Sequence, residues 1–388
     1  MSRAERWMLP DGVEELLPQQ AAEVESLRRR LLDVYACWGY ELVIPPLLEF
    51  TDSLLIGLGS DLDLQTFKLT DQMSGRTLGI RPDITPQTAR MDAHSLNREG
   101  PVRLCYAGSV LHTRPKSLLA SRCPIQVGAE LYGEASVNAD IEVICLMLET
   151  LSLAGVQGVR LDLGHVGIYR ALVKAAELDD ELEHALFDAL QRKAVPELEA
   201  LAERLPAASR DALLGLARLH GGDDVLDRAR DLLAYAPKEV EIALAQLAEV
   251  AAGVRARQPN ADIFFDLGEL RGYHYHTGLV FAAYAPGFGR ALANGGRYDD
   301  VGAVFGRARP ATGFNTDLKT LLVGVAAPAI AGAIAAPIED AEGLWEAVAS
   351  LRAQGERVIS VFPGQVDADG CDRELVFLDG LWQVRARN

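Results

Sequence analysis

Arg271-Gly272-Tyr273-His274-Tyr275-His276 is the most distinctive stretch of this 388-residue sequence. It lies between two segments of strand-like composition, residues 262–267 and 278–284, so these six residues are expected to connect two strands. His274 and His276 alternate along the chain and could share one face of a strand. No third ligand follows nearby, and protein metal sites need three or four ligands. We therefore predict no metal ion here.

The segments that precede this stretch predict the fold class. Further strands are expected at residues 41–44, 102–106, 125–132 and 158–163. Residues 166–258 differ from them, because this segment is rich in Ala, Leu, Glu and Arg and poor in β-branched residues, which favours several short helices. Strands that are interrupted by one helical block, with few βαβ spacings, predict an α+β fold that carries a helical insertion.

The same pattern predicts how the chain is organised. We expect a core in two parts (1–165 and 259–325), the helical insertion (166–258) and a short C-terminal α/β segment (326–388) after a linker of small residues, with a helix at 341–353 and a strand at 358–362. An amphipathic helix is expected over residues 13–38. Thr85 and Asn138 are each expected to cap the start of a helix with a side-chain oxygen.

The composition is that of an acidic globular protein. Lys and Arg number 38 against 55 Asp and Glu, and the formal net charge of −17 repels phosphate backbones. No apolar run reaches the about 18–20 residues that span a bilayer, and the N-terminus has no apolar signal core. The five cysteines form no Cys-x-x-Cys pair, and no P-loop motif occurs. We predict a cytoplasmic protein with no cofactor, no membrane contact and no tRNA partner.

Several motifs resemble, in order, those of histidyl-tRNA synthetases. Residues 39–49 resemble class II motif 1, whose proline (here Pro46) lies at the dimer interface of that family. Arg81-Pro82-Asp83-Ile84-Thr85 resembles its Arg-Pro-Glu-Gly-Thr loop, residues 271–276 resemble its Arg-Gly-Leu-x-Tyr-Tyr signature, and residues 295–299 resemble the start of motif 3. The resemblance covers roughly residues 8–325. It implies a class II aminoacyl-tRNA synthetase-like antiparallel sheet flanked by helices.

The resemblance also implies a pocket for free histidine. A carboxylate at Glu130 can accept a hydrogen bond from an imidazole N–H, and Arg271 can hold the carboxylate of the ligand. Gln126, Thr85 and Asp83 can bind the α-amino group. The complete set of expected histidine-binding residues is Asp83, Thr85, Gln126, Glu130, Arg271, Tyr275 and His276, where His276 replaces the second tyrosine of the signature.

The catalytic motifs depart from the family pattern. Ala107 stands where the motif 2 arginine is expected, Ser109 where its glutamate partner is expected, and Lys319 where the motif 3 arginine is expected. The loop at 111–123 lacks the usual Arg-Pro-Gln-x-Gly-Arg pattern. The segment after residue 325 is too short for the anticodon-binding domain of the family.

These departures favour a sensor over an enzyme. Adenylate formation builds negative charge on the phosphoryl oxygens, and losing one donor to such charge costs about 10²–10³ in rate. A chain that keeps the amino-acid pocket and lacks these donors resembles the regulatory subunits of short-form ATP phosphoribosyltransferase. That enzyme catalyses the first step of histidine biosynthesis. That resemblance implies a non-catalytic homodimer, joined to a separate catalytic subunit in a hetero-oligomer and responsible for feedback inhibition by free histidine. The alternatives are an active histidyl-tRNA synthetase or another class II-like amino-acid-activating ligase.

Overall fold

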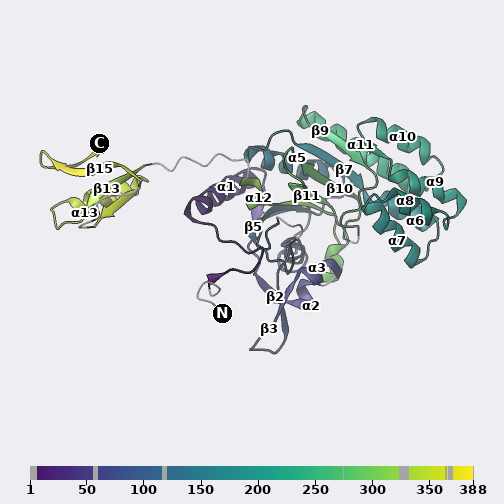
Figure 1. Ribbon diagram of the computed structural model, residues 1–388, viewed down its shortest axis with the longest axis horizontal. Coiled ribbons are helices and arrows are strands. Elements are labelled where there is room, and N and C mark those ends of the chain that lie inside the picture. Colours follow the sequence, from purple (N-terminus) through teal and green to yellow (C-terminus); the bar gives the residue numbers. More distant parts are fainter. Residues whose placement is uncertain are drawn as a thin grey trace. The chain divides into compact units, whose positions relative to one another are not determined.

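The computed structural model describes residues 7–55, 60–115, 120–273, 275–322, 332–362, 365 and 370–387 (Figure 1). The chain divides into two compact units, Met1–Val325 and Ala326–Asn388. His274 and the start of the expected linker lie outside the described residues. Within the described part, no helix is both long enough and apolar enough to cross a membrane.

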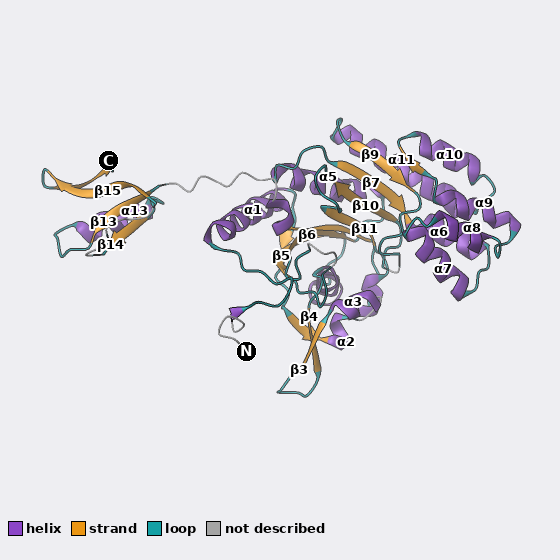
Figure 2. Cartoon of the chain, viewed as in Figure 1, coloured by secondary structure: helices purple, strands orange, loops and turns teal. Residues whose placement is uncertain are grey.

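A nine-stranded sheet forms the centre of the first unit (Figure 2). Its neighbours run antiparallel, except for the parallel pairs β1–β5 and β7–β9. The predicted antiparallel sheet is therefore confirmed. In spatial order the strands are β1 (Glu41–Leu42), β5 (Val102–Ser109), β6 (Ile125–Tyr132), β12 (Ala311–Asp317), β11 (Ala293–Arg297), β10 (Leu279–Tyr284), β7 (Arg160–His165), β9 (Asp262–Asp266) and β8 (His220–Gly221).

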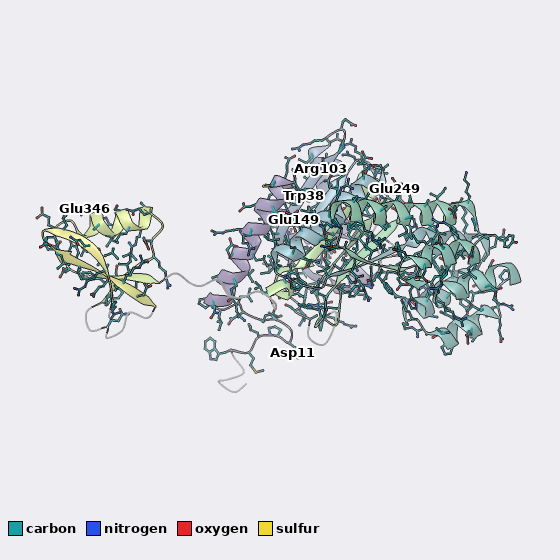
Figure 3. All side chains as sticks on the ribbon, turned by 90° about the horizontal axis from the view of Figure 1, so that it is seen from above. Asp11, Trp38, Arg103, Glu149, Glu249 and Glu346 are labelled. Atoms are coloured by element: carbon teal, nitrogen blue, oxygen red, sulfur yellow. The ribbon has the colours of Figure 1, made fainter. Side chains whose placement is uncertain are left out.

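Helices cover one face of this sheet. α1 (Pro18–Cys37), α5 (Val137–Leu153) and α11 (Lys238–Arg257) contribute to one large apolar core with every second residue of β6, namely Val127, Ala129 and Leu131. At the surface of this layer, the indole nitrogen of Trp38 donates to Glu149 at 3.1 Å (Figure 3). Because side chains alternate along a strand, the intervening residues of β6 face the other side, where the cavities lie.

The helical insertion contains six helices. α7 begins where the carboxylate of Asp179 accepts from the backbone N–H of Leu182 at 2.7 Å, and α8 has a proline in its first turn, both of which favour helix initiation. The helices are α6 (Val166–Ala175), α7 (Asp180–Gln191), α8 (Val195–Ala202), α9 (Ala207–Leu216), α10 (Asp224–Leu232) and α11. The helical character predicted for this segment is confirmed.

A small antiparallel sheet, β2-β4-β3, was not expected from the sequence. Its strands are short and largely polar or exposed, so they carry little period-two signal. The strands are β2 (Leu48–Phe50), β3 (Phe67–Thr70) and β4 (Thr77–Ile80), and the short helices of this half are α2 (Thr51–Leu54), α3 (Ser60–Gln65), α4 (Thr85–Arg90), a π-helical turn (Met91–Leu96), a 3-10 turn (Val301–Phe305) and α12 (Leu318–Leu321).

Both predicted helix caps are wrong. Helix α4 begins at Thr85 itself, and the Thr85 hydroxyl donates to Glu130, whereas a capping oxygen would accept a bond from a backbone N–H of the helix. Helix α5 begins at Val137, directly after Ser136, so Asn138 already lies inside its first turn. The Thr85 hydroxyl is thus used in a tertiary contact, and Asn138 lies two residues beyond the N-cap position of α5, Ser136, whose side chain makes no capping hydrogen bond.

The second unit is a small α/β sandwich. Its four-stranded sheet has the order β14-β13-β15-β16, and α13 (Leu344–Ala353) packs on it through Leu344 and Val348. The strands are β13 (Ala333–Pro337), β14 (Val358–Val361), β15 (Cys371–Leu378) and β16 (Leu381–Ala386). The predicted helix and the strand near residue 358 are confirmed, while the β15–β16 hairpin was not foreseen.

Candidate functional site

Two adjoining cavities lie on the face of the large sheet opposite the main core. The smaller one, here called the inner cavity, has a volume of about 110 Å³. Residues from β6, β11, β12, α4 and the loop between β9 and β10 surround it. Its lining consists of Leu62, Asp83, Thr85, Pro86, Glu130, Tyr275, His276, Asn294, Gly295, Gly296, Tyr298, Gly313, Phe314 and Asn315.

Glu130 is the fully buried acidic group of the inner cavity. Three hydroxyl groups donate to its carboxylate: Thr85 at 2.9 Å, Tyr106 at 3.0 Å, and Tyr298. Burial raises the pKa of Glu130 to about 8, against the opposing effect of these three donors. At neutral pH the empty site therefore holds a largely protonated carboxyl group, which a ligand that donates N–H bonds would convert to the carboxylate.

The backbone opposite Glu130 leaves room for this carboxylate. Gly313 on β12 pairs with Glu130 on β6, and a Cβ atom at Gly313 would lie 1.5 Å from Oε2 of Glu130. No side chain can be accommodated there without moving the acid. Glycine at this position is thus part of the site.

Asp83 and Gln126 form a fixed pair at the edge of the site. The Gln126 amide donates to Asp83 at 3.0 Å and accepts from the backbone N–H of Ile84 at 2.9 Å. Asp83 also accepts from the backbone N–H of Thr85 at 2.9 Å. These bonds fix the orientation of the Gln126 amide and leave Asp83 as an anionic group on the cavity wall.

Tyr275 and His276 close the inner cavity from the β9–β10 loop. The Tyr275 ring stacks on Tyr298 with centroids 5.0 Å apart, and its buried hydroxyl has no hydrogen-bond partner among the described residues. The His276 ring is 5.3 Å from the Tyr275 ring, and its Nδ1–H donates to the carbonyl of Arg271 at 3.3 Å. Burial lowers the pKa of His276 to about 4, so the ring is neutral at pH 7. The site offers a ligand one unsatisfied hydroxyl.

The outer cavity has a volume of about 260 Å³ and shares Asn294 and Asn315 with the inner cavity. Two guanidinium groups line it. Arg271 pairs with Glu269 at 2.5 Å and donates to the Tyr284 hydroxyl, and Arg290 donates to Thr320 at 2.6 Å. Its lining consists of Pro82, Val110, His112, Ala120, Ser121, Pro124, Gln126, Arg271, Arg290, Ala291, Leu292, Asn294, Asn315, Thr316, Asp317 and Thr320.

The expected histidine-binding residues therefore divide between two neighbouring spaces. Gln126 and Arg271 line the outer cavity, whereas the other five line the inner one. Sequence reasoning did not single out Tyr106 and Tyr298, two of the three donors to Glu130. Tyr298 lies within the motif at residues 295–299. The motif could therefore have identified Tyr298 as a site residue, whereas nothing in the sequence indicated that its hydroxyl bonds to Glu130.

The structure corrects the three positions that were assigned to lost catalytic groups. Ala107 packs against the main apolar core, on the face of β5 that points away from both cavities. Ser109 is exposed, and the Lys319 ammonium pairs with Glu14 at 2.7 Å. None of the three lines either cavity. A side chain at Ala107 thus has no route to a ligand, because β5 presents its neighbours to the cavity side.

Val110 and His112, shortly after β5, both line the outer cavity. The ring Nε2 of His112 donates to the carbonyl of Pro82 at 2.9 Å, which requires that nitrogen to carry the proton. Beyond the end of β5 the chain thus presents an imidazole held by the backbone, and not a guanidinium, to the outer cavity.

Comparisons with known proteins establish the family. The family described as "Histidyl-tRNA synthetase" matches residues 12–321, and the "ATP phosphoribosyltransferase subunit HisZ C-terminal domain" matches residues 331–385. Proteins named ATP phosphoribosyltransferase regulatory subunit from Pseudomonas paraeruginosa and Azotobacter vinelandii are 59% and 57% identical to the chain, over 99% of both partners in each comparison. The chain belongs to the family of ATP phosphoribosyltransferase regulatory subunits.

Solved structures agree with this assignment. A Bacillus halodurans structure described as an ATP phosphoribosyltransferase regulatory subunit/histidyl-tRNA synthetase is 29% identical, has a TM-score of 0.82 and covers 94% of this chain and 95% of its own. Histidyl-tRNA synthetase from Nostoc is 18% identical, with a TM-score of 0.77 over 98% of this chain and 97% of its own, and it shows the fold alone. The interpretation of the chain as a non-catalytic regulatory subunit, made from the sequence, is confirmed.

Proposed function

We propose that the chain binds free histidine in the inner cavity and conveys its presence to a separate catalytic subunit of ATP phosphoribosyltransferase in the cytoplasm. The observation that carries the proposal is Glu130: a buried carboxyl group in a cavity of about 110 Å³, next to the unsatisfied hydroxyl of Tyr275. Such a site suits a small ligand with N–H donors at one end. Feedback inhibition by histidine follows if the ligand alters the catalytic partner.

Each part of histidine has a complementary group in the two cavities. One imidazole N–H donates to Glu130, and the Tyr275 hydroxyl meets the other edge of the ligand. Asp83 receives the α-ammonium group. Hydrogen bonds that involve a charged group contribute about 1.5–3 kcal/mol each, so two such bonds support a specific site for a metabolite.

The ligand carboxylate is assigned to Arg271. This side chain lines the outer cavity and is half exposed, where Glu269 holds it. Because Asn294 and Asn315 line both cavities, the carboxylate of a ligand in the inner cavity can face the outer one. Binding then requires Arg271 to turn from Glu269 toward the ligand.

The edge of the large sheet supports a homodimer through the motif 1 region. β1 is the edge strand, and the apolar side chains that follow its course are exposed, Ile44 at 83% and Leu42 and Leu47 at 48% each. An open edge with exposed apolar side chains is costly in water and is normally covered. The net charge of −17 supports a complex that excludes tRNA.

Titration calorimetry on the complex of this chain with its short-form catalytic subunit tests the proposal. We expect a heat of binding with histidine, with an affinity that no other amino acid matches, and we expect inhibition of the complex over the same concentration range. Glutamine and lysine serve as controls, since each keeps the backbone groups and lacks the imidazole. No heat with histidine at millimolar concentration would rule the proposal out.

A further inference from the structure

The loop between β9 and β10 contacts both the inner cavity and the helical insertion. Tyr275 and His276 line the inner cavity, whereas Tyr273 packs among the first two helices of the insertion, α6 and α7. Tyr273, on the side of the helical insertion, is thus only two positions from Tyr275, on the wall of the cavity.

Tyr273 is held within the insertion by several contacts. Its ring meets Tyr169 of α6 edge-on, with centroids 5.4 Å apart, and lies 5.3 Å from the ring of Phe187 in α7. Its hydroxyl donates to the carboxylate of Glu183 at 3.1 Å. Only 8% of the Tyr273 surface is exposed, so the ring cannot shift without disturbing both helices.

Arg170 of α6 binds the backbone of the loop at Tyr273 and at His276. One guanidinium nitrogen donates to the carbonyl of Tyr273 at 3.0 Å and to the carbonyl of His276 at 3.1 Å. The guanidinium carbon also lies 5.0 Å from the centroid of the Tyr273 ring. A single side chain of the insertion thus determines where Tyr275, the residue with the unsatisfied hydroxyl, stands relative to Glu130.

The cavity side of the loop has little freedom. Gly272 has a φ of +67°, and a Cβ atom there would lie 2.4 Å from Nδ1 of His276. On the other side of the ring, a Cβ atom at Gly296 would lie 2.7 Å from its Cδ2. The His276 ring is packed between two glycine backbones, so a ligand that displaces Tyr275 or His276 must move the loop as a whole.

We propose that Arg170 and Tyr273 are positioning residues of the inner cavity, and that occupancy of the cavity is transmitted through them to helices α6 and α7. This inference rests on the proposed binding of histidine. It assigns the response to the helical insertion: a ligand that fixes Tyr275 and His276 also fixes the carbonyls that Arg170 holds. Coupling of this kind needs a contiguous packed route between the two sites, and the loop provides one.

Hydrogen exchange of the intact complex, with and without histidine, measures this coupling directly. We expect histidine to slow exchange in residues 166–191 as well as in the strands that surround the cavity. In the Arg170→Ala complex we expect histidine affinity to fall by about fivefold or more and the protection of residues 166–191 to disappear. Arg170→Lys keeps a cation with N–H donors but lacks the planar guanidinium beside the Tyr273 ring, so it should restore part of both effects.

Two further variants separate positioning from general damage. Lys174→Ala removes an exposed cation one turn further along α6 and should behave as wild type in every assay. Tyr273→Phe keeps the ring and removes the hydrogen bond to Glu183. It should reduce the histidine-dependent protection of α7 from hydrogen exchange and leave the affinity for histidine nearly unchanged. Thermal unfolding without histidine shows whether either helix is already disturbed in the variants.

The outcomes distinguish the two proposals. If histidine binds wild type and protects only the cavity strands, the coupling is refuted while the proposed function stands. The same holds if Arg170→Ala retains the protection of residues 166–191. If wild type shows no heat with histidine, the proposed function fails and the coupling fails with it.

Discussion

Replacement of Glu130 by glutamine tests the chemistry of the inner cavity most directly. The change replaces one carboxyl oxygen by an amide NH2 group and keeps the shape of the side chain, so glutamine resembles the protonated acid. Glu130 is 1% exposed and its pKa is raised to about 8, so at pH 7 roughly nine in ten empty sites carry the proton. A ligand that needs the carboxylate must first release this proton.

The size of the effect follows from two opposing contributions. A charged hydrogen bond to the imidazole contributes about 1.5–3 kcal/mol, which Glu130→Gln loses. Proton release at pH 7 costs wild type about 1.4 kcal/mol when the pKa is near 8, and almost nothing at pH 9. The ratio of dissociation constants, variant over wild type, should therefore rise by about tenfold between pH 7 and pH 9.

Calorimetry at pH 7, 8 and 9 measures this ratio. Titration of the free ligand affects both proteins equally and cancels. Glu99→Gln, at a side chain that is 94% exposed, is the matched control and should show a ratio near one throughout. A ratio for Glu130→Gln that stays constant over this range would refute the reasoning, because Glu130 would then carry the same charge with and without bound histidine.

The same pKa predicts how stability depends on pH. A carboxyl group with a raised pKa in the folded chain binds its proton more tightly when folded, so its contribution to the free energy of unfolding is complete below about pH 4.5 and is lost as the pH rises through about 8. Glu130→Gln has no ionisable group at this position, so its free energy of unfolding does not show this decrease with pH. Its thermal midpoint should rise relative to wild type over that range, and a difference that does not vary with pH would contradict the assignment.

Three other substitution and activity measurements follow from the geometry. Ala107→Arg should destabilise the chain by about 2 kcal/mol or more, because the new side chain is pressed into the main core, whereas Ser109→Arg at an exposed position should change the unfolding midpoint little. Histidine-dependent ATP–pyrophosphate exchange should give no turnover, and measurable turnover would restore the synthetase alternative. Gly313→Ala should abolish histidine binding, since its Cβ would lie 1.5 Å from Glu130, while Gly289→Ala, which meets nothing within 4 Å, should leave binding unchanged.

The sequence predicted the main sheet and the helical insertion because their signals are strong and local. β6, the strand expected at 125–132, has those bounds in the structure, since its apolar residues alternate with Gln126, Gly128 and Glu130 over eight residues. The β2-β4-β3 sheet escaped detection because its strands are only three or four residues long and almost none of their residues is fully buried. The β15–β16 hairpin consists of exposed strands, whose alternation is weak.

The candidate site was predictable in composition but not in orientation. Motif order placed Thr85, Glu130 and Tyr275 in one site, and the structure brings them together around the inner cavity. Which face of β5 a residue occupies depends on the pairing of β5 with β6, a contact between distant segments that no local pattern encodes. Ala107 was assigned to the arginine position from the order of the motifs alone, and the structure packs it against the main core.

The close approach of Gly313 to Glu130 has a consequence for mutations at the Gly313 codon. Almost any codon change that gives this glycine a side chain displaces the acid from its niche without touching the contacts that build the helical insertion or the C-terminal unit. Under the proposed function, a point mutation here removes feedback control by histidine while assembly with the catalytic subunit persists. Strains selected on toxic histidine analogues should accumulate substitutions here, and an organism that overproduces the amino acid could arise in one step.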